Sequence, residues 1–110
     1  MPSRELVAAS AEPMILALLA REDSYGYAII QEVRKLSSER IRWTDGMLYP
    51  VLHRLEKRGL ITSRWVESEH GRRRKYYSLK KRGRSALREQ KENWLAVHNT
   101  LAKVWREQHV

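Results

Sequence analysis

Apolar residues fall in segments of helical spacing separated by short polar breaks. Residues 13–20 (PMILALLA) are too apolar for an exposed helix and predict a buried one. Pro13 suits the first turn of that helix, because a backbone N–H in the first turn has no intrahelical acceptor and its absence in proline therefore loses no hydrogen bond. Residues 4–11 are expected to add helical turns ahead of it, with a kink at the proline.

A second helix is predicted over residues 25–36. One apolar stripe recurs there at intervals of four, four and three residues, formed by Tyr25, Ile29, Val33 and Leu36. Ser24 is expected to be the N-cap of this helix. Gly26 lowers helix propensity, so we expect it to permit close packing. Residues 37–43 follow as a loop.

A third helix is predicted from the N-cap Thr44 to about Arg58. Its buried stripe is Leu48, Leu52 and Leu55, and Gly59 is placed to adopt the left-handed conformation that ends a helix. The opposite face is both aromatic and basic, and it carries Gly46, Tyr49, Pro50, His53, Arg54 and Lys57.

A β-hairpin is predicted next, from two β-prone runs at residues 61–66 and 76–79. The turn lies in residues 67–71, with Gly71 at positive φ. Four consecutive cations, Arg72 to Lys75, follow the turn and lie near the hairpin tip. Trp65 is expected to pack in the core under the hairpin.

The last segment, from Lys80 to about Gln108, predicts one helix of roughly 40 Å. Its apolar residues follow a heptad spacing that is typical of a seam between helices. The seam consists of Leu87, Trp94, Val97, Leu101, Val104 and Trp105. Three short helices cannot cover so long a helix, so we expect a symmetric homodimer joined mainly through residues 85–108.

Composition sets the class of protein. The chain has 110 residues, of which 42% are hydrophobic, and this is enough for one domain. It has no cysteine, no apolar run long enough to span a membrane and no recognisable secretory signal, so we expect a cytoplasmic protein without a membrane partner.

The positive charge is confined to one third of the chain. Residues 54–88 hold thirteen Lys/Arg and three Asp/Glu, whereas the rest of the chain holds nine basic and ten acidic residues. A solvated basic surface does not explain this segregation. A polyanion, and nucleic acid above all, is therefore the expected partner.

The order of the predicted elements is that of a winged helix-turn-helix. We expect a mainly α fold with a small β-hairpin, in which residues 1–79 form the DNA-binding domain and residues 80–110 the dimerisation helix. The outer face of the third helix would enter a major groove, and the hairpin would reach toward the neighbouring minor groove.

Two stretches, 45–61 (DGMLYPVLHRLEKRGLI) and 71–79 (GRRRKYYSL), strongly resemble the hallmark motifs of the PadR family of transcriptional regulators. Residues 24–27 (SYGY) resemble the family's turn before the second helix, and the whole resemblance covers about residues 14–87. It implies a homodimeric winged-helix protein that binds a palindromic DNA operator, usually as a repressor. The family often has Thr or Ser where Met47 stands. The motif carries Pro50 beyond the first helical turn, so we expect a locally distorted but continuous helix there.

Phosphate and base contacts are therefore expected from two sets of residues. The third helix contributes Thr44, Gly46, Met47, Tyr49, Pro50, His53, Arg54 and Lys57, and the hairpin contributes Arg72, Arg73, Arg74, Lys75 and Tyr76. The four histidines have no metal-ligand spacing, so no metal or cofactor is expected. No catalytic constellation can be assembled, which argues against an enzyme.

Trp94 has two interpretations. It can be a seam residue only. In compact PadR relatives, however, a tryptophan in a similar context lines a pore between subunits and stacks planar ligands, which implies an aromatic effector held by Trp94 and His98. Two functions therefore stay open: a repressor that a small-molecule ligand releases from DNA, or a constitutive winged-helix module that binds RNA or protein without responding to a ligand.

Overall fold

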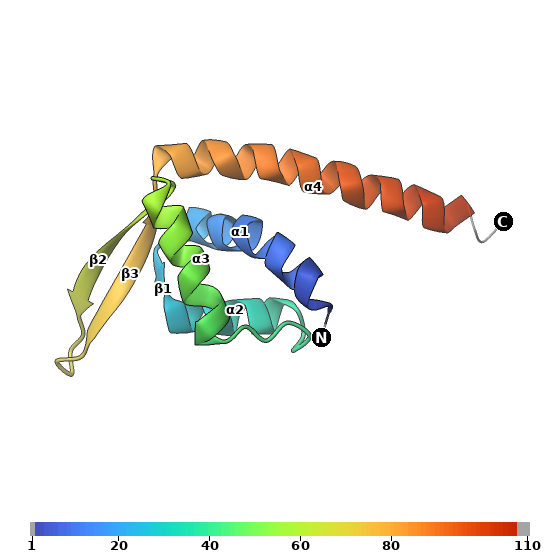
Figure 1. Ribbon diagram of the computed structural model, residues 1–110. Helices are drawn as coiled ribbons and strands as arrows, with labels where there is room; N and C mark the ends of the chain where they lie inside the picture. Colours follow the sequence, from blue (N-terminus) through green and yellow to red (C-terminus); the bar gives the residue numbers. More distant parts are fainter. Residues whose placement is uncertain (1, 108–110) are drawn as a thin grey trace.

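The computed structural model describes residues 2–107. The elements in chain order are α1 (Arg4–Arg21), β1 (Ser24–Tyr25), α2 (Gly26–Leu36), α3 (Asp45–Lys57), β2 (Ile61–Glu67), β3 (Arg73–Leu79) and α4 (Lys81–Glu107). Figure 1 shows the first three helices packed together, the β2–β3 hairpin projecting to one side, and α4 extending as a long arm above α1. The predicted helices, hairpin and fold class are thus confirmed, while the expected helix end at Gln108 lies outside the described residues.

The first helix is longer than its apolar segment. Ser3 caps it by accepting the N–H of Leu6, and Pro13 lies inside it. The helical turns expected at residues 4–11 are therefore confirmed, whereas the placement of Pro13 in a first turn is wrong. The proline removes one hydrogen bond to the carbonyl of Ala9, and water can solvate that carbonyl because Ala9 is exposed. The buried residues Val7 and Ala11 anchor the earlier turns to the core.

One hydrophobic core joins α1, α2 and α3 to the base of the hairpin. Its fully buried large side chains are Ile15, Leu16, Ile29, Leu48, Leu52, Leu55 and Ile61. Burying each such side chain stabilises the fold by about 1.5–3 kcal/mol. The predicted burial of α1 and the predicted stripe of α3 are confirmed, but only Ile29 and Val33 of the predicted α2 stripe face this core: Tyr25 belongs to β1, and Leu36 at the end of α2 is 59% exposed. The outer face of α3 is left to solvent.

The sheet contains a strand that the sequence pattern did not predict. Ser24 and Tyr25 pair with Tyr77 and Tyr76, so the strand order is β1-β3-β2. The predicted N-cap Ser24 is therefore wrong: the cap is Tyr25, whose side chain makes no capping hydrogen bond. The reason is long-range pairing, because the two residues before α2 are held extended along β3.

The hairpin is antiparallel and runs from the pair Ile61–Leu79 at its base to Glu67–Arg73 near its tip. Gly71 adopts the predicted positive φ, at 76°. On the face of β2 that carries Ile61, Ser63 and Trp65, exposure increases toward the tip, from 1% at Ile61 to 59% at Trp65. The expectation that Trp65 packs in the core is thus wrong.

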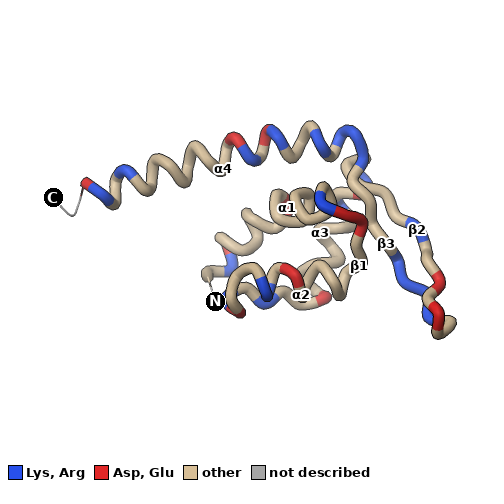
Figure 2. The backbone as a smooth tube through the Cα atoms, turned by 180° about the vertical axis from the view of Figure 1, so that it is seen from behind, with Lys and Arg blue, Asp and Glu red and all other residues tan. Residues whose placement is uncertain are grey.

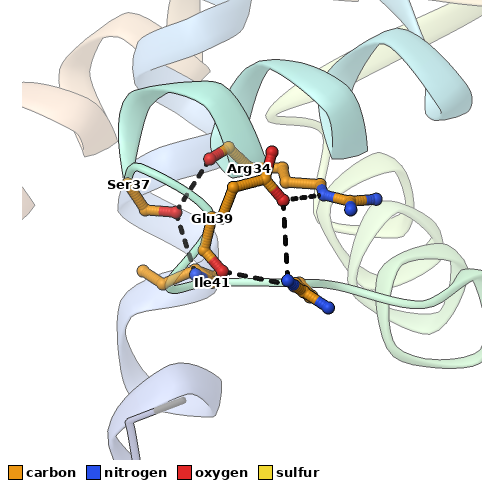
Figure 3. Close-up of polar contacts among 5 residues, drawn as sticks. Arg34, Ser37, Glu39 and Ile41 are labelled. Atoms are coloured by element: carbon orange, nitrogen blue, oxygen red, sulfur yellow. Dashed lines mark hydrogen bonds and ion pairs between the residues drawn. The ribbon is translucent and has the colours of Figure 1, made fainter.

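A short polar network shapes the loop between α2 and α3 (Figure 3). Ser38 and Glu39 have φ of 53° and 71°, which is uncommon outside glycine. The Ser37 hydroxyl donates to the Arg34 carbonyl at 3.2 Å and accepts the Ile41 N–H at 2.9 Å. The Glu39 carboxylate pairs with the Arg34 guanidinium. These contacts hold the left-handed turn that leads the chain from α2 toward α3.

The start of α4 packs tightly on the base of the hairpin. Gly83 is buried, and a Cβ at this position would lie 2.1 Å from the Leu60 carbonyl oxygen. The Lys80 N–H donates to the same carbonyl at 3.0 Å. Leu87 also packs against the core, but beyond it α4 extends past the other helices (Figure 1). No helix among the described residues has the length and hydropathy required to cross a bilayer.

Candidate nucleic-acid interface

The outer face of α3 is the first part of the site. The Thr44 hydroxyl accepts the Met47 N–H at 3.2 Å, which confirms the predicted cap. Because Leu48, Leu52 and Leu55 are buried, the residues turned away from them are exposed; these are Gly46, Tyr49, Pro50, His53, Arg54 and Lys57. The helix continues through Pro50. Met47 differs from the others, because its side chain packs against the core.

A close approach between α2 and α3 holds Tyr49 in place. A Cβ at Gly26 would lie 2.3 Å from the Tyr49 hydroxyl oxygen and 2.8 Å from Cζ. Only glycine leaves this space, which confirms that Gly26 permits close packing. The Tyr49 ring, still 44% exposed, therefore lies directly against the first turn of α2.

The cations of the hairpin lie over aromatic rings. The Arg73 guanidinium is 5.1 Å from the centre of the Trp65 ring, Arg74 is 4.5 Å from Tyr25, and Lys75 is 5.7 Å from Tyr77. Such contacts are worth about 0.5–1 kcal/mol at exposed sites, and they restrict the side chains without neutralising them. Within the described part of the chain, none of the cations from Arg72 to Lys75 forms an ion pair with an acid.

A groove of about 630 Å³ lies between these two parts of the site. Its walls come from two helices and from the β-sheet. The lining residues are Tyr49 and His53 of α3, Gly26 and Tyr27 of α2, Tyr25 of β1, and the hairpin residues Trp65, Arg72, Arg73, Arg74, Lys75 and Tyr77. Figure 2 shows the Lys and Arg positions along β3 and at the start of α4. An anionic chain lying in this groove would be in reach of both α3 and the hairpin.

The floor of the groove is formed by the uncharged side chain of Tyr77. Tyr77 is 4% exposed, and burial raises the pKa of its hydroxyl above the ordinary value of 10.0. The neighbouring Tyr49 and Glu56 side chains raise this pKa further. Glu56 also accepts a hydrogen bond from the Ser63 hydroxyl, which links α3 to β2. The floor therefore adds no charge of its own at neutral pH.

The sequence pattern missed residues that shape the hairpin side of the site. Arg64 forms an ion pair with Asp23 at 3.0 Å and donates to the Ser78 hydroxyl at 2.7 Å, so it ties the hairpin to the segment before β1. Tyr25, which was not predicted to belong to the site, packs against the predicted contact residue Tyr76, with ring centres 5.1 Å apart and ring planes tilted by 58°. Strand geometry offered one signal that Trp65 would be exposed. It lies four residues past Ile61, or about 13 Å along the strand, and this distance places it beyond the reach of the core.

The predicted ligand and seam residues lie on α4, away from the groove. Trp94 is half-buried and His98 is exposed. Val97, Leu101, Val104 and Trp105 are between 42% and 54% exposed, whereas Leu87 packs against its own core. Among residues 2–107, no three His, Asp or Glu side chains are grouped so as to hold a metal ion; His109 lies outside that range.

Comparison with known proteins agrees with this arrangement. Residues 15–89 match the Transcriptional regulator PadR-like family. Transcriptional regulator Rv3488 of Mycobacterium tuberculosis is 38% identical over 86 residues, which cover 78% of this chain and 77% of that protein.

Solved structures of transcriptional regulators agree as well. One from Clostridium thermocellum is 30% identical, with a TM-score of 0.84 over 94% of this chain and 97% of that one. A PadR-like regulator from Bacillus cereus is 29% identical, with a TM-score of 0.79 over 91% of this chain and 95% of that one. The fold is thus a winged helix, and because the family consists of transcriptional regulators, the prediction against an enzyme is confirmed. The chain belongs to the PadR-like family of transcriptional regulators.

Proposed function

We propose that this regulator binds duplex DNA through the groove between α3 and the hairpin. The observation that carries the proposal is a set of cations held over aromatic rings, without acidic partners among the described residues, beside an exposed helix face. The α3 face around Gly46 and His53 would read base edges in the major groove. Tyr49, Arg54 and the hairpin cations would contact phosphates, and exposed Trp65 would lie against the same backbone.

The test begins with selection of duplexes from a random-sequence pool, followed by binding titrations at several KCl concentrations. Replacing Arg73 and Arg74 together by alanine should weaken binding to all sequences alike. The slope of log K against log salt should flatten by about 0.9 for each phosphate that the protein no longer neutralises. The matched control is Lys35→Ala/Arg40→Ala, which removes equal charge from the last turn of α2 and from the loop that follows it, and should have little effect. No preference for any duplex, or equal affinity for RNA, would refute the proposal.

We further propose that the regulator acts as a homodimer and binds a palindromic operator as a repressor. The exposed apolar residues of the last turns of α4, Leu101, Val104 and Trp105, support dimerisation, because isolated helices seldom present such a stripe to water. Sedimentation or light scattering at micromolar concentration tests the dimer, and a stable folded monomer would refute it. A reporter gene placed behind the selected operator tests repression.

The ligand proposal is that a planar aromatic effector binds between the two Trp94 side chains and releases DNA. Trp94 is half-buried on the face of α4 that carries the seam, and His98 lies one turn further along the helix. Stacking on an indole contributes about 0.5–1.5 kcal/mol per aromatic pair beyond area burial. Tryptophan fluorescence titrated with planar dyes should show binding that Trp94→Ala abolishes. Equal dye affinity in the variant and the parent protein would refute this site.

A further inference from the structure

Five cations at the start of α4 have no part in the interface described above: Lys80, Lys81, Arg82, Arg84 and Arg88. All five are exposed. Across residues 70–88 the chain holds nine Lys/Arg and no Asp or Glu. Figure 2 shows Lys and Arg positions gathered at the beginning of α4, separated from the basic part of β3 by a short uncharged stretch.

Three of these cations share one face of the helix. Lys81, Arg84 and Arg88 are spaced by three and four residues, and they point away from the side on which Gly83 and Leu87 pack against the core. We call these three residues the α4 stripe. Within residues 2–107, no member of the stripe forms an ion pair.

The α4 stripe is unfavourable for the isolated chain. Like charges three and four residues apart on a helix repel each other. The first turn of α4 contains no acid, and cations there also oppose the helix dipole. By contrast, the Arg82 side chain lies against the end of α3, where its Nη1 would be 3.3 Å from a Cβ added at Gly59. A partner with negative charge would explain the stripe.

The stripe begins where the α3 face ends. The Leu60 carbonyl accepts the Lys80 N–H, so the first turn of α4 is fixed just beyond the last turn of α3. That last turn carries the exposed interface residues Arg54 and Lys57. From Arg84 to the seam residue Leu101, α4 rises by about 25 Å. The stripe therefore lies at the end of α4 that is remote from the expected two-fold axis.

We propose that the α4 stripe contacts DNA phosphates outside the half-site that α3 reads, on the flank remote from the dimer axis. The inference rests on the proposed DNA binding and extends the footprint of the protein. These contacts are independent of sequence, since Lys and Arg here meet backbone charge only. The flanking DNA would thus add affinity without adding specificity.

The experiment compares two duplexes: the shortest selected operator, and the same operator extended on each side by about ten base pairs of unrelated sequence, roughly one helical turn. Binding to the full-length chain is followed by fluorescence anisotropy over a range of KCl concentrations. The wild type should bind the long duplex more tightly and with a steeper salt slope. Lys81→Gln/Arg84→Gln should not show this increase in affinity. Its salt slope on the long duplex should be lower by about 0.9 for each phosphate left without a cation, and it should bind the short duplex as the wild type does.

The control variant Lys35→Gln/Arg40→Gln carries the same charge change in the last turn of α2 and the loop that follows it, and should retain the higher affinity for the long duplex. A melting temperature for Lys81→Gln/Arg84→Gln at or above that of the wild type would show that folding is intact. Three results would each overturn the inference: Lys81→Gln/Arg84→Gln binds both duplexes more weakly by the same factor, it binds neither more weakly than the wild type does, or the control variant loses as much affinity for the long duplex. If the wild type prefers no duplex at all, the proposed function itself fails, which is a different result.

Discussion

Gly83→Ala should destabilise the protein, although the same change in a helix usually stabilises it. Gly83 lies in the first turn of α4, where the added Cβ would lie 2.1 Å from the Leu60 carbonyl oxygen and 2.5 Å from Leu79 Cδ1. Ordinary contacts of this kind begin near 3.4 Å. The carbonyl belongs to the backbone, so α4 itself would have to move by roughly 1 Å.

The size of the effect follows from opposing contributions. Replacing glycine by alanine inside a helix stabilises it by roughly 0.5–1 kcal/mol. Overpacking costs about 1–3 kcal/mol. Displacing α4 also strains the 3.0 Å hydrogen bond from the Lys80 N–H to Leu60, worth about 0.5–1.5 kcal/mol. We expect a net decrease of about 1–3 kcal/mol in the free energy of unfolding.

Urea unfolding followed by far-ultraviolet circular dichroism measures this change. Protein concentration must be equal in all samples, since the proposed dimerisation would make apparent stability depend on it. The matched control is Gly46→Ala, in the first turn of α3, where the new Cβ would meet only Thr44 Oγ1 at 3.9 Å. The control should be as stable as the wild type or more so. A Gly83→Ala protein that also matches or exceeds the wild type would refute the packing argument.

Three further predictions concern the interface. Thr44→Ala should lower the free energy of unfolding by about 1 kcal/mol because the α3 cap is removed, whereas Thr44→Ser should retain it, as thermal melts can check. Gly26→Ala should displace Tyr49 and weaken DNA binding. In a Tyr49→Ala background the same change should have no further effect on DNA binding, and additive effects of the two substitutions would contradict this coupling. Because the pKa of Tyr77 is raised in the fold, the folded chain keeps this proton where the unfolded chain loses it, so stability should fall as pH rises above about 10, and less steeply in Tyr77→Phe.

Features set by local chemistry were predictable from the sequence. The cap at Thr44 and the positive φ of Gly59 and Gly71, 75° and 76°, depend on a few neighbouring residues and are confirmed. The buried stripe of α3 follows from helical periodicity alone. Because the outer face of α3 is what the stripe leaves exposed, most of that half of the site could also be predicted.

Features set by pairing between distant segments were not predictable. Ser24 looks like a helix cap, yet its backbone pairs with Tyr77 across the sheet. Trp65 looks like a core residue by its size and apolar ring, yet it lies too far along β2 and instead supports Arg73. In both cases the local preference of the residue is plain from the sequence. Its actual environment, however, depends on where β3 lies, and no local pattern specifies that.

In the proposed dimer, helix α4 would connect the seam physically with the proposed DNA-binding face. At its start, Gly83 lies against the Leu60 carbonyl and Leu79, so the helix is fixed to the end of α3 and to the end of β3 at once. A ligand that changes the separation of two α4 helices at Trp94 would therefore move both parts of the site. Linkage requires saturating operator DNA to weaken dye binding by the same factor by which the dye weakens DNA binding. In Gly83→Ala this attachment is loosened, so the ratio of dye affinities measured without and with operator should move toward one. Dye titrations with and without operator measure this ratio. An unchanged ratio would show that coupling does not pass through the start of α4.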